Sequence, residues 1–145
     1  MPSFSNFADF EKYLNQKINV AVKEACVRLL DELDNIIMEK YYEAYNPTGD
    51  VTRTKSYFRS FQFYSAATAK MMNQLTGCVF MDKDAMDYGE FWDGERQLAY
   101  AAEGYHGRKE IQTQWKYWDV FLEYVEKNAF KILKEEMKKQ GIPLK

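Results

Sequence analysis

His106, the single histidine of the chain, is a candidate for acid–base catalysis. It stands between Gly104 and Gly107 and follows Glu103 by three residues, an arrangement in which a carboxylate orients an imidazole as a general base. The chain has no second histidine, GxSxG motif or HExxH motif to complete a catalytic set. A turn histidine bonded to the backbone is the simpler interpretation. We expect no enzyme activity, with a small hydrolase using His106 and Glu103 as an alternative.

The acidic segment 82–103 is the candidate for metal binding. It has seven acids and two bases, a net charge of −5. An EF-hand loop starting at Asp82 needs glycine at its sixth position and glutamate at its twelfth, where this chain has Asp87 and Asp93. The turn-forming glycine and the bidentate ligand are therefore missing. We expect a solvated acidic face, and neither a metal site nor another cofactor.

Cys26 and Cys78 are the only cysteines, and they lack CxxC spacing. Isolated cysteines without a paired histidine are typical of reduced thiols in an intracellular protein. A second local feature is the basic, hydroxyl-rich run 53–59, which has the groups to hold phosphates. The formal net charge of −2 nevertheless excludes the basic footprint of a general nucleic-acid binder. Charged residues on the outside of a short turn are the simpler interpretation of this run.

The sequence predicts a long N-terminal helix over residues 6–45, which carries Cys26. Ser5 or Asn6 can cap it, and its apolar residues recur with an average spacing of about 3.6 residues, the period of a straight amphipathic helix. At about 1.5 Å per residue such a helix is longer than a domain of this size is wide, so part of it should project or contact another subunit. A second set of apolar residues widens the apolar face of this helix, so we expect two other elements to pack against it. The first set is Phe7, Phe10, Leu14, Ile18, Ala21, Ala25, Leu29, Leu33 and Ile36, and the second is Val22, Cys26, Leu30 and Ile37.

The middle of the chain, residues 57–103, has the patterns of short strands. Alternation predicts strands near 61–66 and at 75–81, and we expect a third short strand near 97–102 within a long acidic loop. Residues 66–73 fit either a helix or a hairpin. Residues 104–107 predict a tight turn.

A second helix is expected over residues 114–140, capped by Thr113 and ended by Gly141. The length of 145 residues predicts a single domain over residues 1–145. No apolar run approaches the roughly 18 residues of a membrane span. The expected core face of this helix is Trp115, Trp118, Leu122, Val125, Ala129 and Leu133.

Aromatic residues make up 17% of the chain, and eleven of them are Tyr. Tyrosine combines a large contact area with a polar group and suits surfaces that a partner covers, although the same residues can also fill a small core. The end of the first helix and the basic run are therefore candidates for a protein interface. These candidates are Tyr41, Tyr42, Tyr45, Arg53, Thr54, Tyr57 and Arg59.

The order of these features resembles the small head–tail joining proteins of long-tailed phages and prophages, also called neck or tail-completion proteins. Their pattern of Arg-Thr-Gly, an apolar residue, Ser and an apolar residue is met at Arg53, Thr54, Tyr57, Ser60 and Phe61. Lys55 stands where that family has glycine. The long charged helix, the short strands and the lysine-rich C-terminal helix follow in the same order.

The resemblance implies a non-enzymatic subunit of α+β class, in which the long N-terminal helix and the C-terminal helix pack on a small antiparallel sheet. It also implies assembly into a ring between the portal side of the capsid and the tail tube. Its partners would be further copies and other neck or tail proteins, and its location the virion after synthesis in the bacterial cytoplasm. An acidic segment of such a ring could face the DNA channel, where like charge prevents adhesion. A soluble intracellular adaptor that binds a host protein through residues 41–45 is the alternative. The candidate channel-facing acids are Asp82, Asp84, Asp87, Glu90 and Asp93.

Overall fold

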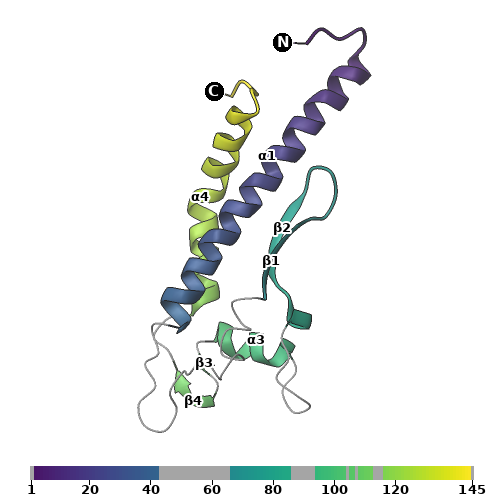
Figure 1. The fold of residues 1–145 in the computed structure, drawn as a ribbon. Helices are drawn as coiled ribbons and strands as arrows, with labels where there is room; N and C mark the ends of the chain where they lie inside the picture. The colour runs from purple at the N-terminus through teal and green to yellow at the C-terminus, as the bar shows by residue number, and fades with distance from the viewer. Residues whose placement is uncertain are drawn as a thin grey trace.

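The computed structural model describes residues 2–42, 66–85, 94–103, 105–106, 108–112 and 116–144. Two long helices, α1 (Phe7–Ile36) and α4 (Tyr117–Lys139), run antiparallel, and the hairpin β1 (Ala67–Met71) and β2 (Gly77–Met81) lies along α1 (Figure 1). The short helix α3 (Gly94–Ala102) and a second hairpin, β3 (Tyr105–His106) with β4 (Arg108–Gln112), follow the first hairpin along the chain. The α+β class is therefore confirmed.

Helix α1 begins as the sequence predicts. The Asn6 side chain accepts a hydrogen bond of 2.9 Å from the Asp9 backbone N–H, which satisfies one of the unpaired donors of the first turn. The predicted helix continues beyond Ile36 as a π-helix over Ile37–Tyr42, and its predicted last residues, 43–45, lie outside the described part of the chain. The wider turn of the π-helix changes the side-chain spacing at the end of α1.

The expectation of two neighbours for α1 is confirmed by α4 and the β1–β2 hairpin. The hairpin pairs from Ala67 with Met81 to Met71 with Gly77, which resolves the ambiguity of residues 66–73 in favour of a strand. Its turn reaches the side chain of Asn19, which donates a hydrogen bond of 2.5 Å to the Gln74 carbonyl. The predicted strand at 75–81 corresponds to β2, and of the predicted strand at 61–66 only residue 66 is described.

The third predicted strand, at 97–102, is wrong, because this segment lies within helix α3. Leu98, Ala101 and Ala102 recur at helical spacing and pack against the buried cluster, and most of the segment consists of good helix formers. Gly94 starts the helix so close to the chain before it that a Cβ there would overlap the Lys83 carbonyl. In the predicted turn 104–107, Tyr105 and His106 form a strand paired with the unpredicted β4.

Helix α4 also differs from its prediction at the start. It begins at Tyr117 rather than Gln114, and its N-cap position is Lys116, whose side chain makes no capping bond. Thr113 is therefore not the cap; it lies outside the described residues. The predicted end is confirmed, because Gly141 has a φ of +80° and lies directly after the last turn, where a left-handed residue ends a helix.

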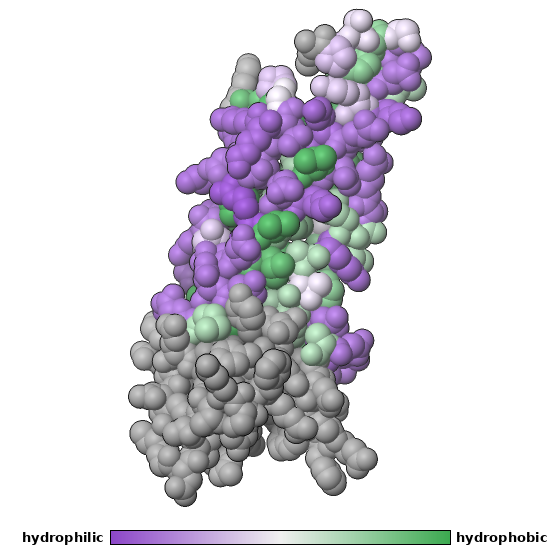
Figure 2. Space-filling model, in the orientation of Figure 1, coloured by the Kyte–Doolittle hydropathy of each residue, from purple (hydrophilic) through white to green (hydrophobic). Residues whose placement is uncertain are grey.

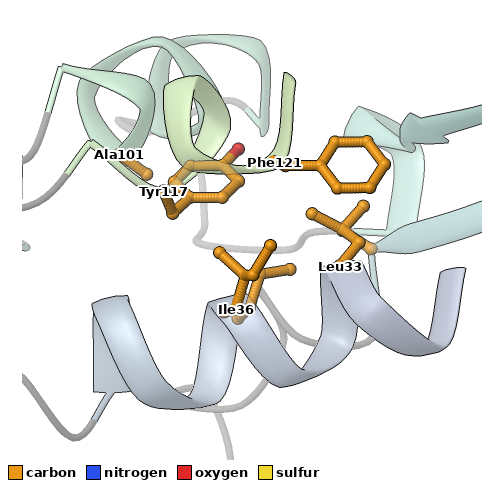
Figure 3. Close-up of a cluster of buried hydrophobic side chains, with 7 residues drawn as sticks. Leu33, Ile36, Ala101, Tyr117 and Phe121 are labelled. Carbon is orange, nitrogen blue, oxygen red and sulfur yellow. The ribbon is translucent and has the colours of Figure 1, made fainter. Parts of the chain in front are cut away.

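The buried cluster lies where α1, α3 and α4 meet. Leu33 and Ile36 from α1 point towards Tyr117 and Phe121 of α4, with Ala101 of α3 beside them (Figure 3). The buried residues of α4 are Tyr117, Phe121, Ile132 and Glu136. The core face predicted for this helix is therefore displaced around the helix, and Leu122, which it included, is 48% exposed.

Candidate interaction surfaces

Most of the residues proposed from the sequence as interface or channel positions lie outside the described part of the chain. Tyr41 and Tyr42 are the last two residues of the π-helix. Asp82 and Asp84 lie directly after β2, within the described residues. The positions outside the described residues are Tyr45, Arg53, Thr54, Tyr57, Arg59, Asp87, Glu90 and Asp93.

Asp82 has a local structural role. Its carboxylate accepts a hydrogen bond of 2.9 Å from the Asp84 backbone N–H, at the start of the 3-10 turn Lys83–Ala85. Asp84 itself is exposed, and Lys83 Nζ lies 3.5 Å from Glu95 Oε2. Across the described ranges, no three His, Cys, Asp or Glu residues gather in a way that would hold a metal ion. This part of the acidic segment is a solvated surface.

Of the proposed acid–base pair, only His106 belongs to the second hairpin. His106 lies on β3, and Glu103 lies just after α3, where its Oε2 is 3.4 Å from Lys116 Nζ. The His106 imidazole is outside the described side chains. Of the cysteines, both are free, and burial, with the nearby Cys78, raises the pKa of the Cys26 thiol. A raised pKa favours the neutral thiol, the less reactive form.

An apolar pocket of about 330 Å³ lies between β2, α3 and α4. It has no carboxylate, imidazole or amine in its described lining, so this lining offers contact area without acid–base groups. The lining residues are Phe80, Met81, Leu98, Ala99, Ala102, Tyr117 and Trp118. Within the described helices, none is long and apolar enough to cross a membrane.

An ion-pair network holds α1 against α4. Arg28 Nη1 lies 2.9 Å from Glu136 Oε1 and 2.9 Å from Glu135 Oε2, and Lys139 Nζ lies 2.8 Å from the same Glu136 oxygen. Glu136 is only 4% exposed. The hydrogen bond from Lys139, opposed by burial and assisted by Arg28, lowers the pKa of Glu136. This network stabilises the helix pair and leaves no open carboxylate for catalysis at this position.

A second apolar stripe runs along α4 beside its buried side. We call Leu122, Phe130, Leu133 and Met137 the outer stripe; Phe130 is 78% exposed. At about 100° per residue, Leu122 and Leu133 lie about 40–60° around the helix from the buried Glu136, and Met137 and Phe130 lie about 100–120° from it. The core face that the sequence predicts for α4 includes Leu122 and Leu133 but neither Phe130 nor Met137.

The C-terminal tail turns the end of the outer stripe into a pocket. The Ile142 N–H donates to the Met137 carbonyl at 3.1 Å and the Gly141 N–H to the Lys138 carbonyl at 3.0 Å, the two bonds of a Schellman motif. This turn directs Leu144 back over the helix. The resulting pocket of about 190 Å³ is lined by Phe130, Leu133, Lys134, Met137 and Leu144.

The N-terminal end of α1 is a third uncovered surface. Figure 1 shows it diverging from α4 and extending past the hairpin. Phe7 is 75% exposed, although it lies on the side of α1 that is buried further along, at Ala21 and Ala25. In the space-filling view, hydrophobic residues reach the surface between hydrophilic ones along the described part of the molecule (Figure 2).

Comparison of the chain with protein-family models, with curated proteins and with solved structures finds no match.

Proposed function

We propose that this protein is a structural subunit of the neck of a long-tailed phage, where a ring of copies joins the portal side of the capsid to the tail. Its partners are further copies of itself and other neck or tail proteins, and its location is the virion. The pattern at Arg53, Thr54, Tyr57, Ser60 and Phe61, together with the order of helices and strands, supports this family.

The observation that carries the proposal is that α1 and α4 each leave apolar residues uncovered, at different places on the chain. Phe7 is 75% exposed at the end of α1 and Phe130 is 78% exposed on α4. Uncovered apolar surface of this kind marks protein contacts. A ring needs two different surfaces on each subunit, because every copy contacts one neighbour with each.

The acidic segment has a place in this proposal as the channel-facing surface. Asp84 is exposed on the 3-10 turn after β2, and Asp87, Glu90 and Asp93 follow in the sequence. Like charge would keep the passing DNA from adhering to the ring. An image of the assembled neck with residues 82–93 on its outside would overturn this assignment while leaving the neck role intact.

Deletion of the gene from its phage or prophage tests the proposed function. We expect lysates with DNA-filled heads and separate tails by electron microscopy, and intact particles when the wild-type gene is supplied in trans. Intact particles without the gene would overturn the proposal.

The same complementation distinguishes the hydrolase alternative. A His106→Ala variant should restore joined particles, because a structural subunit needs no general base. If a folded His106→Ala variant fails while wild type succeeds, acid–base chemistry at His106 is favoured instead.

A further inference from the structure

We infer that the N-terminal end of α1 in one copy packs on the outer stripe of α4 in the next copy. Phe7 then enters the pocket of about 190 Å³ that Leu144 helps to line, and Glu11 lies beside Lys134. This inference deepens the proposed neck ring by naming its subunit contact, and it takes from the proposed function only that the occupant is a second copy. The two surfaces match in exposure, shape and charge.

The end of α1 lacks cover from its own chain. Among the described residues, the hydrogen bonds and ion contacts of the segment 2–18 are local: Asn6 and Ser5 bond to Asp9, and Lys17 lies over the Tyr13 ring. The first tertiary hydrogen bond of α1 is made by Asn19. The apolar side of the helix is buried at Ala21 and Ala25, half-buried at Leu14 and Ile18, and 75% exposed at Phe7, so its cover decreases towards the N-terminus.

This end is also preorganised for binding. The Phe4 ring lies 5.5 Å from Phe10 and 5.1 Å from Tyr13, and Phe7 lies 6.3 Å from Phe10, all between ring centroids. Contacts among the rings, together with the Asn6 cap, restrict their motion before a partner arrives. A partner that binds a preordered cluster loses less conformational entropy.

The pocket on α4 fits one aromatic ring. Its volume is about 190 Å³, and a cavity of about 150 Å³ is large enough for benzene. Met137 and Phe130, which line it, lie about 100–120° around α4 from Glu136, the residue that pairs with Arg28 of the subunit's own α1. The described lining contains no residue of α1, so the pocket is open to a ring from another copy, and Phe7 is the most exposed aromatic ring on α1.

The charges at the two surfaces are complementary. Glu11 follows Phe7 by four residues and so lies on the same side of α1, while Lys134 lines the pocket. Within the described part of the chain neither residue is in an ion pair of its own subunit. The segment 127–144 has five Lys and two Glu, and both Glu contact Arg28. An approaching carboxylate therefore meets a surface of net positive charge.

The two surfaces differ from each other, which decides the type of assembly. A contact between one surface and a different one on the next copy leaves each end free for another copy, and it closes into a ring when the rotation permits. A contact of α1 ends with each other would instead stop at a two-fold dimer. The inference therefore predicts an open-ended or cyclic series of subunits.

Sedimentation of the full chain over a range of concentrations tests the contact. Glu11→Lys and Lys134→Glu should each raise the concentration of half-association by about tenfold, and the double exchange should restore it to within about threefold of wild type. Glu24→Lys, the same change at another exposed position of α1, should have little effect. A wild-type protein that is monomeric up to about 1 mM, or a double exchange that gives no recovery, would overturn the inference.

Cross-linking distinguishes the two arrangements. In a Cys78→Ser background, copies with Phe7→Cys are mixed with copies with Phe130→Cys under mild oxidation. A covalent dimer should form in the mixture and in neither protein alone. Efficient linking of Phe7→Cys copies to each other would show two-fold pairing and overturn the inference. Neither experiment depends on particle assembly, so self-association by this contact with a normal deletion phenotype would refute the neck role alone.

Discussion

The backbone of Gly77 in β2 lies against the sulfur of Cys26 in α1. A Cβ built on Gly77 would overlap Cys26 Sγ and would come within 3.2 Å of Val22 Cγ1 and 3.3 Å of Met71 Sδ. The missing side chain is therefore what allows the hairpin to approach the helix. Through this contact β1 and β2 pack on α1, which also packs against α4.

Gly77→Ala should destabilise the protein by about 1–3 kcal/mol, because the added methyl overpacks the contact with Cys26. Chemical denaturation measures the change. The double variant Gly77→Ala with Cys26→Ala should recover much of the loss, since the sulfur that the methyl meets is removed. If the double variant is no more stable than Gly77→Ala, the sulfur is not the obstacle.

Arg28→Ala should lower the free energy of unfolding by about 1–2 kcal/mol, because Glu136 then stays buried with Lys139 alone. The pKa of Glu136 is lowered in the folded protein, so its contribution is present above the unfolded pKa and is lost as the pH falls through the folded pKa. The deficit of Arg28→Ala should therefore shrink towards low pH in denaturation curves.

Lys127→Ala is the matched control for Arg28→Ala. It removes the exposed Lys127–Glu123 pair of 2.6 Å on the solvent side of α4, and exposed pairs contribute little. If the two variants lose the same free energy of unfolding, the Arg28 network does not stabilise the packing of α1 against α4 more than an exposed ion pair would.

Asp34→Asn should stabilise the protein at high pH. Burial, and then the neighbouring Asp31, raises the pKa of Asp34 to about 6. Because the folded state holds this proton more tightly, ionisation destabilises it as the pH rises from about 4 to 6, and the penalty is complete above 6. With allowance for partial exposure, we expect a gain of about 1–2 kcal/mol at pH 8 and little at pH 4. An equal effect at both pH values would contradict this.

Gly141→Ala should loosen the C-terminal tail. A φ of +80° costs a residue with a Cβ about 1 kcal/mol or more, so the Schellman bonds of Ile142 and Gly141 weaken and Leu144 leaves the pocket. Hydrogen exchange at Ile142 should rise several-fold. Unchanged protection would show that the tail is held by other contacts.

The helical period predicted α1 and its neighbours well, because Ala21, Ala25, Leu33 and Ile36 repeat without interruption and are all buried. The core side of α4 could not be chosen by the same rule. Glu136 can be buried because Lys139 and Arg28, which is 108 residues away in sequence, both pair with it, and Phe130 has the residue type of a core position although it is 78% exposed. Residues 97–102 form part of helix α3 rather than the expected strand because most of them are good helix formers.

The two apolar sides of α4 divide its circumference unequally. One side packs in the subunit core and another carries the outer stripe. The remaining sector of the helix makes neither contact, so its residues can be substituted at little cost. They are Glu123, Lys127, Lys131 and Lys138. Among relatives of this protein, substitutions in α4 should therefore concentrate in that sector. Phe130, although it is more exposed than Lys127, should change far less often.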